Sequence, residues 1–128
     1  MKKFLIAASA AAMVAGAAMA GGHGERYVMI THTQGTDPFW PVVEKGGRDA
    51  AAAVGATLEY NFDVSGDMAA MAALIEAAAA SEPDGIIVSL PYAAALGPAI
   101  RSAVADGIPV VTMNSGLESS SELGALMH

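Results

Sequence analysis

Apolar and polar residues alternate along the chain in short runs and in longer, helix-like stretches. The short runs are rich in β-branched and other large apolar residues, and they predict strands at residues 27–33, 57–62, 85–89 and 109–113. The last two runs are nearly continuous in apolar residues, which is typical of strands that are buried on both faces of a sheet.

Three Ala-rich segments between these strands predict helices, over residues 39 or 41 to 54, 67–81 and 93–105. Their apolar positions recur at helical spacing. The expected inward-facing residues are Val43, Gly47, Ala50, Ala51 and Val54 in the first; Met68, Met71, Ala72, Ile75, Ala78 and Ala79 in the second; and Leu96, Ile100, Ala103 and Val104 in the third. Asp67 can cap the second helix, and Gly55 can end the first.

The predicted strands begin 30, 28 and 24 residues apart. Each interval has room for one crossover helix, so the pattern indicates repeated β–helix–β units. Such units build an α/β fold, with a doubly wound parallel sheet and helices on both faces.

The N-terminal segment has the pattern of a secretory signal peptide. Lys2 and Lys3 precede an Ala-rich apolar run, and Ala18-Met19-Ala20 provides the small residues at which signal peptidase cuts. The alternative is a membrane anchor, but the run is short and consists mostly of Ala. We therefore predict a signal peptide over residues 1–20 and a soluble periplasmic domain over residues 21–128.

The sequence contains no cysteine, which excludes both a lipid anchor of the lipoprotein type and disulfide bonds. A lipoprotein needs a cysteine after its cleavage site, so we expect a protein that is not membrane-anchored. Disulfides are also excluded, and the fold must be held by an ordinary core.

The C-terminal segment begins as a polar, Ser-rich stretch over residues 117–122, which predicts a loop. Another apolar run starts at residue 123 and stops at residue 128 without a polar ending. We expect a truncated chain, since a domain usually ends in a surface segment. A short C-terminal edge strand is the alternative.

Charge and motifs exclude several functions. All thirteen acidic residues lie beyond residue 20, where only four basic residues oppose them, so a nucleic-acid partner is not expected. The sequence has no nucleotide-binding G-x-G-x-x-G after the first strand, no P-loop and no G-x-S-x-G. His23, His32 and His128 have no partner at metal-ligand spacing, and His32 is expected inside or beside the core. We expect neither an enzyme nor a metal or other cofactor.

Ligands of open parallel sheets bind outside the carboxyl ends of the strands. The loop after the first predicted strand carries Asp37, Phe39 and Trp40 there. Aromatic rings stack on the apolar C–H face of a sugar, and a carboxylate accepts hydrogen bonds from its hydroxyls. The plainer alternatives are that Asp37 only caps a helix and that the two aromatic residues only belong to the core.

Three further candidates follow later strands. Asn114 has donors and acceptors that suit a diol, although it could be an ordinary turn residue. Tyr92 and Ser89 follow the third strand and are weaker candidates, because helix entry and loop formation explain them equally well.

The order and spacing of three segments, at residues 37–40, 83–88 and 106–114, are similar to those of a known protein family. The chain resembles the type I periplasmic sugar-binding proteins, ribose-binding-like, that serve ABC importers, over about residues 25–128. The resemblance implies the N-terminal lobe of a two-lobed receptor, monomeric when full length, that delivers a sugar to an ABC transporter permease. It places a polar ligand contact on Asp37, stacking aromatics on Phe39 and Trp40, and a polar contact on Asn114.

Two residues depart from the ribose-binding pattern. Ser115 stands where ribose binders have an arginine, and Leu90 stands where they have a polar amide. Another pentose, a hexose or a polyol therefore fits as well as ribose.

Other functions remain open at this point. A chemotaxis or signal receptor of the same fold would differ only in its partner. A small flavodoxin-like enzyme domain would need a phosphate-binding loop where Phe39 and Trp40 stand. A repressor with the same sensor fold would begin with a DNA-binding helix-turn-helix rather than with a signal peptide.

Overall fold

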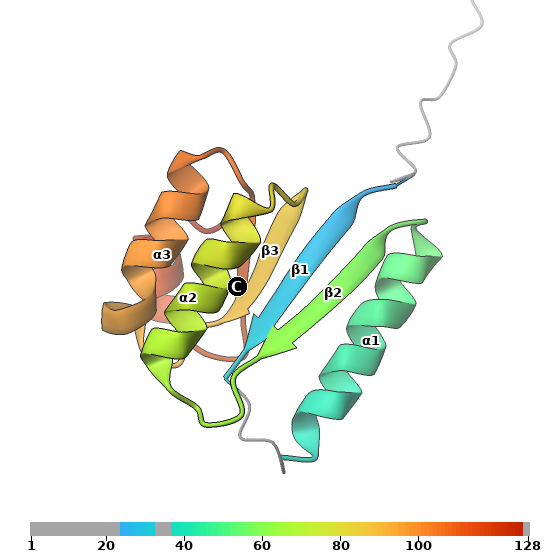
Figure 1. Ribbon diagram of the computed structural model, residues 1–128, viewed down its shortest axis with the longest axis horizontal. Coiled ribbons are helices and arrows are strands. Elements are labelled where there is room, and N and C mark those ends of the chain that lie inside the picture. The colour runs from blue at the N-terminus through green and yellow to red at the C-terminus, as the bar shows by residue number, and fades with distance from the viewer. Residues whose placement is uncertain (1–23, 33–36, 127–128) are drawn as a thin grey trace, which may run out of the picture.

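A computed structural model describes residues 24–32 and 37–126 of the chain. Strands and helices alternate along these residues (Figure 1). The elements are β1 (Arg26–Thr31), α1 (Phe39–Ala53), β2 (Thr57–Phe62), α2 (Met68–Ala80), β3 (Gly85–Ser89), α3 (Ala93–Ala105), β4 (Val110–Met113) and α4 (Leu117–Ser120).

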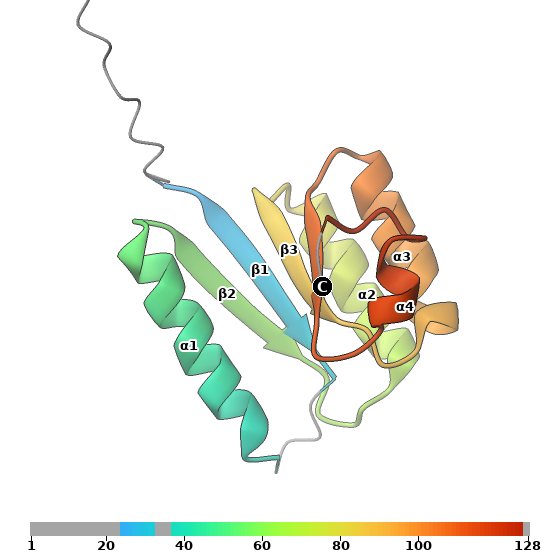
Figure 2. The same cartoon turned by 180° about the vertical axis from the view of Figure 1, so that it is seen from behind.

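The four strands form one parallel sheet in the order β2-β1-β3-β4. The chain moves one way along the sheet from β1 to β2 and the other way from β2 to β3 and β4. Since crossovers of this kind are right-handed, α1 must lie on the opposite face from α2 and α3. Figures 1 and 2 show this arrangement, with α2 and α3 together and α1 apart from them along β2. The predicted doubly wound α/β fold is confirmed.

The face under α2 and α3 carries the larger core. The predicted inward residues of both helices are buried or packed against this core, as their spacing requires. Its buried members are Val28, Ile30, Met71, Ile75, Ala78, Ile86, Val88, Leu90, Leu96, Ala99, Ile100, Ala103, Ile108, Val110 and Leu123. Asp67 caps α2 as predicted, because its carboxylate accepts a hydrogen bond of 2.7 Å from the backbone N–H of Ala69.

The face under α1 has a smaller core, whose buried members are Met29, Ala51, Ala56 and Leu58. Gly47 lets α1 approach β2 closely, since a Cβ there would lie 2.7 Å from the side chain of Leu58. Other residues on the predicted inward face of α1 are not covered, and Val54 is 53% exposed. The helical spacing was predicted correctly, but only part of the predicted face is buried.

The Ser-rich stretch differs from the sequence prediction. Residues 117–120 form the short helix α4 instead of a loop. The hydroxyl of Ser120 donates a 2.8 Å hydrogen bond to the carbonyl of Gly116 and lies 2.5 Å from the hydroxyl of Thr112. These contacts hold the turn against β4. Leu123 then enters the core, and the N–H of Leu126 donates to the carbonyl of Val110 at 2.8 Å.

Several predictions concern residues outside the described part of the chain. They are the signal peptide over residues 1–20, residue 33 of the first predicted strand, and the last two residues of the C-terminal run. These remain predictions. Within the described part, the first strand ends at Thr31, before His32, and so is shorter than predicted. Among the described helices, none combines the length and apolar character needed to span a bilayer.

Candidate ligand-binding site

The carboxyl ends of the strands meet at one edge of the sheet, toward which the arrowheads of β1, β2 and β3 point in Figure 1. The strand order places the loops after β1, β3 and β4 side by side at this edge. Neighbouring strands lie about 4.8 Å apart, so these three loops begin within roughly 10 Å of one another. All six predicted site residues lie on these loops or at the helix or strand ends beside them.

Asp37 shapes the start of α1. One carboxylate oxygen, Oδ1, accepts a 2.9 Å hydrogen bond from the backbone N–H of Phe39. Pro38 occupies the N-cap position, but its side chain makes no capping hydrogen bond. Asp37 therefore provides the side-chain hydrogen bond at the start of this helix. Asp37 is exposed, and within the described residues its second oxygen has no hydrogen-bond partner. The residue therefore closes the helix start and still presents an acceptor to solvent.

The two neighbouring aromatic residues differ in exposure. Phe39 is 48% exposed, whereas Trp40 is only 4% exposed. Their rings meet edge to face, with centroids 5.0 Å apart and an interplanar angle of 79°. The sequence left open whether these residues face a ligand or the core. In the structure Phe39 offers a free ring surface, and Trp40 supports it from inside.

His32, which directly follows β1, lies half-buried beside Trp40, in line with its expected place inside or beside the core, but its position among the candidate site residues was not predicted. Its backbone N–H donates a 3.0 Å hydrogen bond to Oγ of Ser89, and its ring Nδ1 lies 2.7 Å from the same oxygen. The ring also contacts Trp40 edge to face, with centroids 5.1 Å apart. Burial lowers the pKa of His32, and the nearby carboxylate of Asp37 partly opposes this shift. A signal was available, since parallel pairing brings the ends of β1 and β3 together.

Ser89 is fully buried beneath this contact. Its hydroxyl is held by His32, so in this conformation Ser89 shapes the site through His32 rather than at its surface. Direct contact of Ser89 with a ligand stays a prediction.

The loops after β3 and β4 are joined by the two residues that depart from the ribose-binding pattern. The N–H of Leu90 donates a 3.1 Å hydrogen bond to Oγ of Ser115. Gly116 adopts a φ of 86°, and a Cβ there would lie 2.6 Å from Cβ of Leu90. Leu90 itself is 1% exposed and belongs to the larger core. Leu90 and Ser115 thus both help to pack the loops after β3 and β4 against each other.

Asn114 and Tyr92 present exposed polar side chains. Asn114 has a φ of 66°, a left-handed conformation that Asn tolerates better than most residues. It is exposed, and its side-chain amide makes no hydrogen bond within the described residues. Tyr92 is 58% exposed and precedes α3, where its carbonyl accepts from the N–H groups of Ala95 and Leu96. The structure places both residues on the edge loops but shows no direct contact between them and Asp37 or Phe39.

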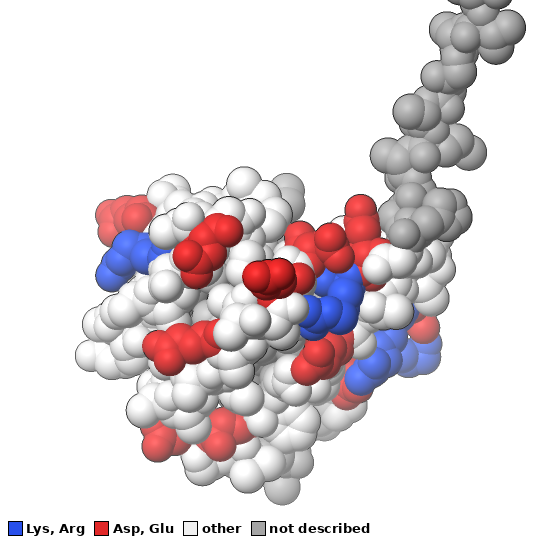
Figure 3. Space-filling model, turned by 45° about the horizontal axis from the view of Figure 1, so that its top comes forward, with Lys and Arg blue, Asp and Glu red and all other residues white. Residues whose placement is uncertain are grey.

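Acidic side chains are spread over the surface seen in Figure 3, and basic side chains lie beside some of them. Within residues 24–32 and 37–126 the ion pairs are Arg26–Glu59, Lys45–Asp49 and Arg48–Glu44, all at solvent-accessible positions. Over residues 24–32 and 37–126, His, Asp and Glu side chains form no group that could hold a metal ion.

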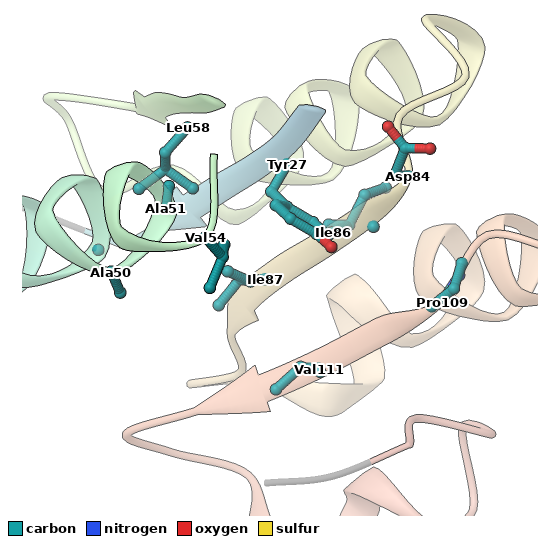
Figure 4. Close-up of a pocket in the computed structure, with 12 residues that line it drawn as sticks. Tyr27, Ala50, Ala51, Val54, Leu58, Asp84, Ile86, Ile87, Pro109 and Val111 are labelled. Carbon is teal, nitrogen blue, oxygen red and sulfur yellow. The ribbon is translucent and has the colours of Figure 1, made fainter. Parts of the chain in front are cut away.

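A groove of about 520 Å³ lies on the α1 side of the sheet (Figure 4). Its walls include Ala50 of α1, Val54 directly after α1, Ile87 of β3 and Val111 of β4. Ligand pockets combine apolar walls with a few directed polar groups. This groove is almost entirely apolar and lies on the face of the sheet, away from the loop edge, so it does not suit a sugar or polyol.

The loop edge of the parallel sheet carries an exposed aromatic ring, a carboxylate and an amide, so the chain is an α/β domain with polar and aromatic groups at the carboxyl ends of its strands. Residues 27–125 match the family model described as periplasmic binding protein domain. The chain belongs to this family. The prediction made from the resemblance is thereby confirmed at the level of family and fold.

Solved structures support the same assignment. A carbohydrate transporter from Acidothermus cellulolyticus 11B, in complex with myo-inositol, is 46% identical, with a TM-score of 0.77 over 82% of this chain and 36% of its own. An arabinose-binding protein from Geobacillus stearothermophilus is 32% identical, with a TM-score of 0.69 over 81% of this chain and 34% of its own. A periplasmic ribose ABC transporter structure from Conexibacter woesei is 29% identical, with a TM-score of 0.69 over 81% and 34%.

The chain thus spans about a third of the length of these relatives. No curated protein sequence matches it.

Proposed function

We propose that this chain forms a ligand-binding lobe of a periplasmic solute-binding protein that captures a sugar or polyol for an ABC importer. The observation that carries the proposal is the exposed ring of Phe39 at the carboxyl edge of the sheet, next in the chain to Asp37, whose exposed carboxylate accepts a hydrogen bond from the Phe39 backbone N–H through one oxygen only among the described residues. The relatives bind or transport myo-inositol, arabinose and ribose according to their descriptions, which is consistent with a ligand of this class.

The chemistry of the edge fits such a ligand. The Phe39 ring provides an apolar surface for the C–H face of a sugar, and Trp40 holds that ring from behind. Asp37 accepts hydrogen bonds from ligand hydroxyls, while the amide of Asn114 both donates and accepts. Tyr92 adds a further hydroxyl from the adjacent loop. Each of these groups recognises a diol or a ring face, so the set binds the ligand without transforming it.

The cellular setting belongs to the same proposal. Residues 1–20 direct export and are removed, and the mature protein is a periplasmic, unanchored receptor that delivers its ligand to an ABC permease. The receptor is monomeric at full length. It acts without a cofactor, and no nucleic acid takes part.

The described residues supply one wall for the ligand. A site that covers only one side buries less of the ligand, and high affinity requires most of its surface to be covered. We therefore expect this chain alone to bind with a dissociation constant on the order of millimolar.

Titration with myo-inositol, arabinose and ribose tests the proposal. Trp40 is the only tryptophan of the chain and contacts Phe39, so its emission reports a ligand on that ring. We expect a saturable change in Trp40 emission with at least one of the three compounds. Phe39→Ala should weaken this binding at least tenfold, because it removes the stacking surface.

Phe62→Ala is the control, since Phe62 is a 41% exposed phenylalanine at the end of β2 whose ring contacts Tyr60 and which is not one of the proposed ligand contacts. Its substitution should leave the dissociation constant unchanged. A response that never saturates, or that is the same in the Phe39→Ala variant, would refute the site. A submicromolar constant would instead contradict the description of a one-walled site.

A further inference from the structure

Three side chains from separate elements meet behind Phe39, and the proposed function does not yet use them as a group. His32 comes from the end of β1, Ser89 from the end of β3 and Trp40 from the first turn of α1. His32 contacts both of the others, through the 2.7 Å approach of Nδ1 to Oγ of Ser89 and through its edge-to-face contact with the indole ring. The group therefore connects two strands to the aromatic pair.

The hydrogen bonds around the hydroxyl group of Ser89 indicate which ring nitrogen of His32 carries the proton. Oγ of Ser89 already accepts from the backbone N–H of His32. If the ring also donated from Nδ1, the hydroxyl hydrogen of Ser89 would need another acceptor. Ser89 is 0% exposed, and none of the described residues provides one. A buried donor without an acceptor is costly. The hydroxyl must then donate to Nδ1, which leaves the ring proton on Nε2.

We propose that Ser89 holds His32 in the Nε2–H tautomer, and that His32 in this form positions Trp40 beneath Phe39. Protonation of His32 would turn Nδ1 into a donor facing Ser89, and the hydroxyl hydrogen would lose its acceptor. The contact between β1 and β3 would have to rearrange, and Trp40 would lose the support that it takes from His32. Only the consequence for ligand binding rests on the proposed function.

The surroundings of His32 contain few charges that could compensate. Ser89 on β3 is uncharged, and Trp40, the α1 residue whose ring contacts the imidazole, is aromatic. Among the described residues, Asp37 is the titratable group that acts on His32, and its negative charge favours the protonated ring. Burial acts in the opposite direction and dominates. The neutral tautomer is thus the form that these elements hold together at neutral pH.

The first test needs no ligand. Protonated imidazole quenches indole emission, so the fluorescence of Trp40 should fall as the pH decreases, with a midpoint below the ordinary titration range of histidine. His32→Gln should abolish this step while keeping a side chain of similar size. Ser89→Ala should move the midpoint upward by about 0.5–1 pH unit, because it removes the donor that stabilises the neutral ring.

The nitrogen chemical shifts of His32 provide a readout on the unmodified chain that does not depend on the folding of any variant. At neutral pH they should show a protonated Nε2 and an unprotonated Nδ1. A protonated Nδ1 would overturn the tautomer assignment. A fluorescence step that persists in His32→Gln would overturn the link between His32 and Trp40.

A second test concerns binding. If myo-inositol or another compound binds at neutral pH, its dissociation constant should increase at least threefold below the fluorescence midpoint, and His32→Gln should remove this pH dependence. If no compound binds but the fluorescence and the nitrogen shifts behave as expected, the proposed function fails and the His32–Ser89–Trp40 arrangement stands. Binding with a constant that does not change across the midpoint would refute the positioning role.

Discussion

The two faces of the sheet are covered to different extents. On one face, α2 and α3 pack against each other and against β1, β3 and β4, and both Ile75 and Ile100 are 0% exposed. On the other face, α1 contacts β2, while β3 and β4 border the open groove of Figure 4. The same strands therefore have one side in a closed core and one side beside an uncovered apolar surface.

The strand order explains this difference. The crossover through α1 leads from β1 outward to β2, so α1 is placed over that end of the sheet. The two later crossovers both run over the opposite face. As a result, the described residues supply two long helices to one face and one to the other, and Ile87 and Val111 border an open groove. The amphipathic pattern of a helix indicates that it has an apolar side, but not that this side will be fully covered.

The largest expected effect compares two adjacent isoleucines of β3. Ile86 is 1% exposed and faces the closed core, whereas Ile87 is partly buried and borders the groove. Ile86→Ala should reduce the free energy of unfolding by about 2–5 kcal/mol, since it leaves a cavity in a packed core. Ile87→Ala should cost about 1 kcal/mol, because solvent already reaches that side chain. Urea unfolding measures both, and equal losses would show that the groove is closed in solution.

A second comparison uses glycines on the two faces. At Gly116 an added Cβ would lie 2.6 Å from Cβ of Leu90, a core residue that cannot move aside, and its φ of 86° disfavours other residues. At Gly47 the near atom is the end of the Leu58 side chain, which can change rotamer. Gly116→Ala should cost about 2–4 kcal/mol.

Gly47→Ala should lie within about 1 kcal/mol of the original protein, since alanine also favours the helix. Thermal unfolding with circular dichroism detection distinguishes the two variants. Equal destabilisation would mean that α1 is held against its face as rigidly as the larger core is held on the other.

These comparisons also show which features the sequence could reveal. The bounds of β2, β3 and α3 follow from local patterns, and the structure reproduces the predicted ranges. Local chemistry also identified Asp67 as a cap and Gly55, with a φ of 75°, as the end of α1. Features that depend on one segment meeting another were harder to predict. Helix α4 was missed because its Ser-rich sequence has no helical apolar stripe, and its stability depends on contacts with β4.

The candidate site also combines features that local sequence patterns predict with features that depend on contacts between distant segments. Sequence order placed Asp37, Phe39 and Asn114 at strand ends, and the topology puts those ends at one edge. The hydrogen bond between His32 and Ser89 joins residues 57 positions apart, so no local pattern could show it. The burial of Trp40 beside the exposed Phe39 was likewise a question of packing, since adjacent aromatic residues in a sequence look alike.

The smallest expected effect concerns His32, which lies at the carboxyl edge of the sheet, between the two faces. Burial lowers the pKa of His32 in the folded chain, whereas the unfolded chain keeps the ordinary value. Between these two values the unfolded state binds more protons, so the free energy of unfolding should fall as the pH decreases through this window and then level off. Because His32 is partly solvent-exposed, screening keeps the change well below that of Ile86→Ala. His32→Gln should flatten the curve just below the ordinary titration range of histidine. This window lies above the range where Asp63 titrates, since hydrogen bonds from Ser65 lower the pKa of that carboxyl group. Urea midpoints across this range measure the slope, and an unchanged slope in His32→Gln would assign the acid sensitivity to a group elsewhere in the molecule.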